Sequence, residues 1–364
     1  MTAVAIDEFF ARRQAYAAEI REIYADAERR MLTKVAKRIA RGIDNIKEPG
    51  WAERKLAEIH ALNREIQGDI VDLRKLDPKI ADVVEAAWKD GADKAAEDLI
   101  KTKLTEIHPP TEEALLTRGQ QMRVAGQETV SRLAEMLNRA IPEVDRAYHA
   151  ITLRASNLAL TGALTGRQAA QVALDEFADK GITFFIDKLG RRWDIASYAE
   201  CKVRTDSMNA YRDANASQLQ DMGHDLVIVS TSSESCDICE PWEGQVCSLS
   251  GNSDKYPALE EAKSDGLFHN NCTHVTGIYI ECITPPMDMI PASEKHDNYE
   301  EKQQQRYLER GVRQWKNRGT VAISDDAKQK ADGKVKEWQG RLRTFTEDTG
   351  RRRDYGRESI TRAR

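Results

Sequence analysis

The chain has 364 residues, enough for two or three domains, and is 40% hydrophobic, 32% charged and only 6% aromatic. This balance predicts an elongated, helix-rich protein with modest cores, and the net charge of −5 argues against nucleic-acid binding by the chain as a whole. No apolar run reaches the roughly 18 residues of a membrane-spanning helix. Residues 1–7 lack the basic region and apolar core of a signal peptide, so we expect synthesis in the cytosol.

The first half of the chain is predicted to be almost entirely helical. In the first helix, apolar residues such as Ile20, Tyr24 and Met31 recur three or four positions apart. Both a plain helical bundle and helices that pack on a partner, or on copies of this chain, are compatible with this narrow apolar stripe. Gly91 marks a candidate interruption and Pro142 a break. The expected helices span residues 7–44, begin at residues 51 and 77, and span 111–137, 143–160 and 165–179.

The second half of the chain mixes strands with helices. β-branched and aromatic residues at 182–186, followed by a turn at 187–190, predict a short hairpin. An apolar run at 225–230 predicts a buried strand. The remaining expected elements are helices at 198–222, 256–262, 298–319 and 327–348, a turn and strand over 241–249, and a last strand at 275–280.

Residues 287–364 are more basic than the rest of the chain. They contain 19 Lys and Arg against 14 Asp and Glu, a net charge of +5, so the remainder carries −10. From Arg351 onward the chain has almost no apolar residues. We expect a flexible basic tail, which is either solvated or anchored on DNA or on an acidic protein surface.

Cysteine and histidine residues cluster between residues 236 and 274. Cys236 and Cys239 form a C-x2-C pair, and an H-x2-C-x-H group follows at His269, Cys272 and His274. Two cysteines with this spacing can face one tetrahedral ion, and zinc takes four Cys or His ligands. The pattern predicts a closed, structural zinc site with these three cysteines as ligands. Either His269 or His274 is the fourth ligand, and the sequence does not choose between them.

Other interpretations of the cysteines need no metal. The residues could remain unpaired, or Cys236 and Cys239 could oxidise outside the cell, as could Cys247. Because four of the six cysteines lie between residues 236 and 272, a metal is favoured over a disulfide in a reducing cytosol. Cys201 and Cys282 have no evident role and are expected to be small buried residues.

Short motifs follow one another in a characteristic order along the chain. They are Asp187, Gly190 and Trp193; Tyr198 and Arg204-Thr205; Cys236-x2-Cys239; Trp242-x-Gly244; Tyr256-Pro257; Gly266-Leu267; His269-x2-Cys272-x-His274; Gln304 through Arg310; and Arg313-x-Trp315-Lys316. This combination resembles the phage minor capsid proteins, relatives of the Mu-type minor head protein. The resemblance covers roughly residues 110–350 and is strongest over 182–282.

The resemblance implies a structural virion protein of a phage head, made in the host bacterial cytoplasm and present in few copies. Such proteins are associated with the portal vertex, act in head assembly and can be ejected with the DNA. The implied partners are the portal protein and the major capsid protein. We further expect contact with packaged DNA through the basic tail and self-association through the long helices. Zinc is inferred from the ligand spacing alone, and no catalytic site is expected.

The expected fold is mostly α, with a small α+β zinc-stapled domain between an elongated helical N-terminal region and a helical C-terminal arm. The expected regions are 1–110, 111–181, 182–284 and 285–364.

Two other functions are compatible with the ligand pattern. A zinc-stapled nuclease would use one of the two histidines as its base, but the loop offers only Asp254, Glu260 and Glu261 and no clear carboxylate pair. A cellular zinc-bearing DNA-binding module would need a basic helix beside the site, whereas residues 236–274 are acidic or neutral.

Overall fold

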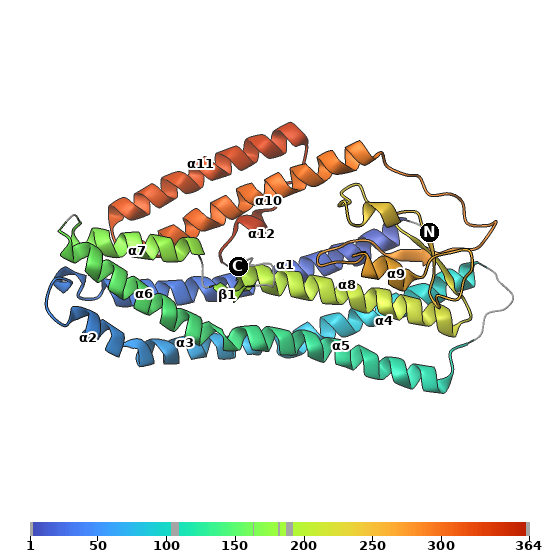
Figure 1. The fold of residues 1–364 in the computed structure, drawn as a ribbon, viewed down its shortest axis with the longest axis horizontal. Helices are drawn as coiled ribbons and strands as arrows, with labels where there is room; N and C mark the ends of the chain where they lie inside the picture. The colour runs from blue at the N-terminus through green and yellow to red at the C-terminus, as the bar shows by residue number, and fades with distance from the viewer. Residues whose placement is uncertain (1–2, 103–108, 163, 181–182, 187–191, 362–364) are drawn as a thin grey trace. The chain divides into compact units, whose positions relative to one another are not determined.

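The structure, a computed structural model, describes residues 3–102, 109–162, 164–180, 183–186 and 192–361 (Figure 1). Most of these residues are helical, as the sequence predicts, and no helix among them is long and apolar enough to cross a membrane. The helices are α1 (Ala3–Ala40), α2 (Trp51–Ala57), α3 (Ile59–Arg74), α4 (Asp77–Lys101), α5 (Glu112–Asn138), α6 (Ala140–Leu160), α7 (Gly166–Lys180), α8 (Ile195–Asp221), α9 (Leu259–Ser264), α10 (Ala292–Thr320), α11 (Asp325–Thr349) and α12 (Tyr355–Glu358), with short 3-10 turns η1 (Ile43–Asn45) and η2 (Glu240–Trp242).

Two small antiparallel sheets account for the strands. β1 (Thr183–Ile186) pairs with β2 (Arg192–Asp194), which confirms the expected hairpin, while its turn lies outside the described residues. In the second sheet, β3 (Leu226–Val229) is the central strand between β4 (Val246–Ser248) and β5 (Thr276–Ile278). Val227 lies opposite Cys247 on one side and Ile278 on the other. The expected small α+β portion is therefore present.

The expected interruption at Gly91 is wrong, whereas the expected break before Glu143 is present but falls a few residues earlier, between α5 and α6. α6 begins at Ala140, so Pro142 falls in its first turn, where a missing backbone N–H costs no intrahelical hydrogen bond. α4 continues through Gly91, whose lack of a side chain allows close approach of another backbone segment. Thr111 caps α5 as expected, because its Oγ1 accepts a hydrogen bond from the backbone N–H of Ala114 at 3.2 Å.

The described chain divides into two compact units, each assembled from three separate segments. Unit 1 comprises residues 1–17, 77–131 and 201–303, and unit 2 comprises residues 18–76, 132–200 and 304–364. The three-stranded sheet belongs to unit 1, and the β1–β2 hairpin belongs to unit 2. The four consecutive regions expected from the sequence remain a prediction.

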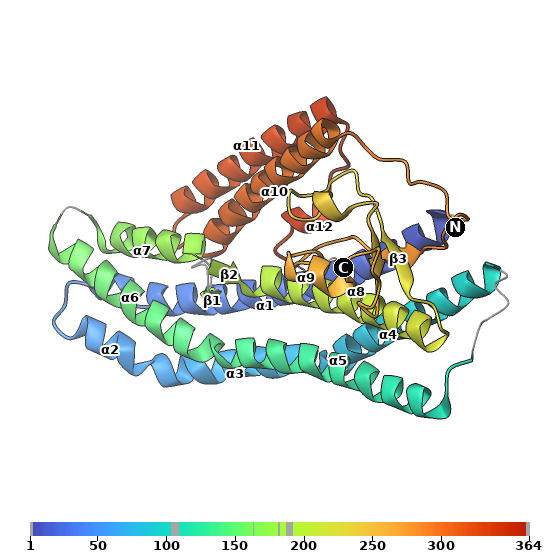
Figure 2. The same cartoon turned by 45° about the vertical axis from the view of Figure 1, so that its right-hand side comes forward.

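Unit 2 buries the apolar stripe of α1. Ile20, Tyr24 and Met31 are fully buried within the chain, as are Leu62 and Ile66 of α3. Of the two alternatives for this stripe, the structure therefore favours packing within the chain over packing on a partner. In the same unit, α11 lies beside residues 304–320 of α10 in both views (Figures 1 and 2).

Residues 351–361 also pack within unit 2, in contrast to the expected flexible tail. Glu358 is only 1% exposed, and its carboxylate accepts a hydrogen bond from Arg353 Nη2 at 2.7 Å. Arg357 Nη2 donates to Glu200 Oε1 at 2.6 Å. The positive charges that made this segment look solvated are thus partly neutralised by carboxylates of the same chain.

Unit 1 has its main apolar core between the three-stranded sheet and the ends of two helices (Figure 2). Val227 and Val229 of β3 pack with Leu99 of α4 and Leu219 of α8. A second core joins α4 to α8 through residues that include Trp88. Two helices thus support the sheet whose central strand leads into the cysteine-rich loop.

We predict that Gly91→Ala destabilises the protein by about 1–3 kcal/mol, because overpacking forces the backbone to shift. A Cβ atom at Gly91 would lie 2.1 Å from the carbonyl oxygen of Tyr211, where no flexible side chain can move away. The matched control is Gly68→Ala in α3, where a Cβ would meet no atom within 4 Å. Chemical denaturation should show Gly68→Ala neutral or stabilising by about 0.5–1 kcal/mol, and equal effects of the two changes would contradict this account.

Candidate metal centre

A tight turn positions the first two candidate ligands. The backbone N–H groups of Cys239 and Glu240 both donate to the carbonyl of Cys236, each at 3.0 Å. η2 follows directly, with Pro241 near its start. This local geometry brings both sulfurs into one group of potential ligands, as the C-x2-C spacing predicts.

A second turn positions the remaining candidates and is held by α8. The N–H of Cys272 donates to the carbonyl of His269 at 2.9 Å, and Asn271 adopts a positive φ of 65°. Asparagine tolerates this left-handed conformation better than most residues. Its Oδ1 accepts from Arg204 Nη1 at 3.0 Å, and its N–H donates to Thr205 Oγ1 at 3.1 Å. The Arg204-Thr205 motif thus acts by anchoring this turn.

The structure brings all five predicted residues together in two overlapping groups. One contains Cys236, Cys239 and His269, the other Cys239, Cys272 and His274, and within each group the ligand atoms lie within 4.8 Å of one another. We call these five residues the ligand cluster. Cys239 belongs to both groups, so it connects the two turns.

The interatomic distances suit a tetrahedral ion. The sulfurs of Cys239 and Cys272 are 3.7 Å apart, close to the roughly 3.8 Å expected for two sulfurs that each lie about 2.3 Å from a tetrahedral zinc ion. His274 Nδ1 lies 3.4 Å from the sulfur of Cys272, near the corresponding sulfur–nitrogen spacing of about 3.5 Å. His269 Nε2 lies somewhat closer, 3.0 Å, to the sulfur of Cys236.

Each histidine has an oxygen acceptor on the ring nitrogen that faces away from the sulfurs. His269 Nδ1 lies 2.8 Å from the carbonyl of Asn270, and His274 Nε2 lies 2.6 Å from Oε1 of Glu243. An N–H donated to these acceptors leaves the lone pair of the other nitrogen directed at the cysteines. This arrangement is usual for metal-binding histidines, and both histidines have it.

Glu243 is a buried carboxylate that the sequence analysis did not single out. It is 3% exposed, and Lys295, which is 2% exposed, donates to its second oxygen. Burial alone would raise the pKa of Glu243, but hydrogen bonds from His274 and Lys295 outweigh it and hold that pKa below its ordinary value. The carboxylate therefore stays ionised and orients the His274 ring. Only its place inside the Trp242-x-Gly244 motif hinted at a role.

Arg212 of α8 holds the second turn through its backbone carbonyls. No pattern in the sequence indicated this role for Arg212. Its guanidinium donates to the carbonyls of Cys272 at 2.7 Å and His274 at 2.8 Å, and it lies over the ring of Phe268 with 4.4 Å to the centroid. Burial lowers the pKa of Arg212 to about 10, so it remains charged at neutral pH. Phe268 itself has a positive φ of 65°, which a bulky residue rarely adopts without such support.

The pKa values of the Cys239 and Cys272 thiols are shifted in opposite directions. Their mutual hydrogen bond lowers the pKa of Cys272, aided by His274 and Arg212, and the same bond together with burial raises the pKa of Cys239. The two pKa values shift in opposite directions because each thiol is the hydrogen-bond partner of the other. A bound cation would favour thiolates at both positions and release a proton on binding.

Other residues named in the sequence analysis lie apart from the ligand cluster. Cys247 is buried in the unit 1 core, whereas Cys282 is exposed, contrary to the expectation for it. The half-buried Cys201 does have a contact, because Asn271 Nδ2 lies 3.2 Å from its sulfur. The carboxylates considered for a nuclease, Asp254, Glu260 and Glu261, are exposed, and none joins either ligand group among the described residues.

We predict that Arg212→Lys lowers the free energy of unfolding by about 1–3 kcal/mol, because a single ammonium cannot reach both buried carbonyls. The control is Arg123→Lys on the exposed face of α5 in the same unit, which should change stability by less than about 0.5 kcal/mol. Urea denaturation of both variants measures the difference. Equal stability of the two would show that Arg212 does not support the turn.

Comparison with known proteins gives the family. No solved structure matches the chain. The chain is similar to a protein named "Structural protein" of Lactococcus phage LL-H, with 24% identity over 331 residues that cover 85% of this chain and 88% of the relative. The family model described as phage minor capsid protein 2 matches residues 12–347. The resemblance to phage minor capsid proteins is therefore confirmed, and the chain belongs to the phage minor capsid protein 2 family.

Proposed function

We propose that this protein is a structural component of the phage head that associates with the portal vertex, acts in head assembly and contains a structural zinc ion. The observation that carries the proposal is the family match over residues 12–347, nearly the whole chain. The phage structural protein similar to this chain supports a place in the virion. The Mu-type resemblance supports the portal vertex as its location, with the portal and major capsid proteins as partners.

The zinc ion would serve to hold unit 1 together. Cys239 is fully buried and Cys272 is 6% exposed, and both belong to the same apolar core as β3. Four protein ligands leave no open position for a substrate, which is the arrangement of structural rather than catalytic zinc sites. The ion would connect two turns that lie some thirty residues apart in the sequence. Its binding would offset the entropy lost when the loop between these turns is closed. This role supports a non-enzymatic function.

Contact with packaged DNA through the C-terminal residues has less support. Arg353 and Arg357 already bind carboxylates of this chain, whereas phosphate contacts need cations that are free to bind. Self-association through α1 has less support for a similar reason, because the stripe that would mediate it is buried. Ejection with the DNA rests on the resemblance alone.

We predict about one zinc ion per chain in freshly reduced, purified protein, measured by elemental mass spectrometry. Cys236→Ser and Cys272→Ser should each lose the metal and melt at a lower temperature, because binding free energy at such a site is folding free energy. Cys282→Ser, at an exposed cysteine outside the ligand cluster, is the control and should keep both properties. Protein that is fully folded and free of any metal would rule out the zinc ion.

The same measurement on His269→Ala and His274→Ala identifies the fourth ligand. The variant that removes the ligand should lose zinc, while the other should keep it. If His274 is the ligand, Glu243→Gln should also weaken zinc affinity, by about 10–100-fold, because the carboxylate orients the ring.

Cross-linking of purified phage heads tests the proposed location. We expect cross-links between this protein and the portal protein, with only a few copies per head by quantitative mass spectrometry. Phage carrying Cys272→Ser should incorporate less of the protein than phage carrying Cys282→Ser, since loss of the metal would unfold unit 1. Absence of the protein from heads, or cross-links to tail proteins alone, would contradict the proposal.

A further inference from the structure

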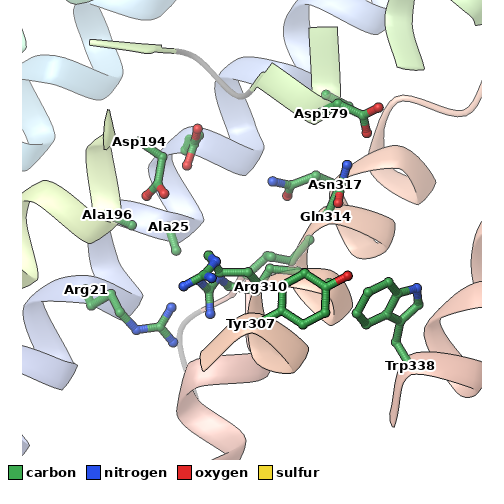
Figure 3. Close-up of a pocket in the computed structure, with 15 residues that line it drawn as sticks. Arg21, Ala25, Asp179, Asp194, Ala196, Tyr307, Arg310, Gln314, Asn317 and Trp338 are labelled. Carbon is green, nitrogen blue, oxygen red and sulfur yellow. The ribbon is translucent and has the colours of Figure 1, made fainter. Parts of the chain in front are cut away.

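Unit 2 contains a cavity of about 510 Å³ that the proposed function does not use (Figure 3). This volume is in the range of small-molecule sites in proteins. Its walls come from α1, α7, β2, the start of α8, α10, α11 and the segment after α12, all through residues of unit 2. Three arginines, Arg21, Arg310 and Arg313, line it, and Figure 3 shows Arg21 and Arg310 below Asp194 and Asp179 in the view.

Within the described residues, these arginines use few of their hydrogen-bond donors. Arg21 is 3% exposed; it donates to the carbonyl of Gly356 and otherwise has Glu200, whose Oε2 is 3.7 Å from its Nε. Arg313 donates to one backbone carbonyl of the C-terminal segment, and no hydrogen bond or ion pair is found for Arg310. A guanidinium has five N–H donors, so most of the donors at this wall have no acceptor from the described chain.

Most of the carboxylates at the cavity are already engaged. Arg318 binds both oxygens of Asp179, its Nε lying 2.6 Å from Oδ1. Both oxygens of Asp194 accept hydrogen bonds from Ser197, at 2.7 and 2.8 Å. The third carboxylate, Glu28, also has an interaction within the protein and lies two helical turns along α1 from Arg21.

Carboxylates lie near the cationic wall but leave most of its N–H donors unused: the charges of Asp194 and Glu309 act on Arg313, and neither residue accepts a hydrogen bond from it among the described residues. Glu200 is shared, because it also accepts a hydrogen bond from Arg357. Burial lowers the pKa of Arg21, and burial followed by the charge of Arg21 lowers the pKa of Arg313 to about 10, so both remain charged at neutral pH. A bound anion would supply acceptors for the guanidinium N–H groups that the described chain leaves unused.

An aromatic pair lies beside the arginines. Tyr307 and Trp338 meet edge to face, with ring centroids 5.5 Å apart and planes at 63°. The approach depends on Gly311, where a Cβ atom would lie 2.1 Å from Trp338. The pair offers apolar surface next to the cationic wall, which suits a ligand that carries a ring as well as a negative charge.

We propose that this cavity binds a phosphate ester of about the size of a mononucleotide, with the phosphate at Arg21, Arg310 and Arg313 and the ring beside Tyr307. Guanidinium groups bind phosphate oxygens through charge-assisted, often bidentate hydrogen bonds. The phosphate could belong to a free nucleotide or to the backbone of a nucleic acid, since both present the same chemistry to the arginines.

Isothermal titration calorimetry of the full chain tests the proposal with adenosine monophosphate, adenosine, inorganic phosphate and a short single-stranded oligonucleotide at constant ionic strength. We expect adenosine monophosphate to bind at least about tenfold more tightly than adenosine, because only the former can accept from the arginines. Tighter binding of the oligonucleotide than of the mononucleotide would identify nucleic acid as the source of the phosphate.

Arg310→Ala is the decisive variant, because Arg310 is exposed and its loss should leave the melting temperature unchanged. We expect it to weaken binding of the phosphate compounds about tenfold, the usual effect of losing one hydrogen bond to a charged group. The control is Arg343→Ala, an exposed arginine of α11 that does not line the cavity. No binding by any phosphate compound at millimolar concentration, or equal affinities of the two variants, would overturn the proposal.

Discussion

The two hydrogen bonds from Arg212 to the carbonyls of Cys272 and His274 fix the position on which the ligand cluster depends. A buried backbone carbonyl needs a partner, and in this irregular loop no strand supplies one. Once these carbonyls are held, Cys272 faces Cys239 and His274 faces Glu243. The chain then enters β5, so the same contact also sets where the edge strand begins.

The proposed zinc ion and the proposed phosphate ester would act on different compact units. The ligand cluster lies in residues 201–303 of unit 1, and the arginine-lined cavity is built only from unit 2. Loss of zinc and loss of the phosphate ligand can therefore be measured as separate effects on stability. The proposed ion would stabilise a fold, whereas the cavity offers guanidinium hydrogen-bond donors that the described chain leaves unused.

Residue spacing in the sequence correctly predicted the features that are determined by residues close together in the chain. The helices, the β1–β2 hairpin, the strand before Cys236 and the five ligand candidates follow from spacing over a few residues. Glu243 and Lys295 are 52 residues apart and meet only through tertiary packing, so spacing could not pair them. The expectation of a solvated segment from Arg351 failed for the same reason. Arg357 binds Glu200, which is 157 residues away in the sequence, so no local pattern could reveal this partner.

The packing of residues 353–358 has a consequence for the timing of biogenesis. Arg21 donates to the carbonyl of Gly356, a contact between residues 335 positions apart. α1 is synthesised early, but a buried guanidinium in it obtains this acceptor only after residue 356 has left the ribosome. Unit 2 therefore completes its folding after translation of this segment, and the nascent chain must stay soluble until then. A protein with this topology reaches its final fold as a finished chain and not during its own synthesis.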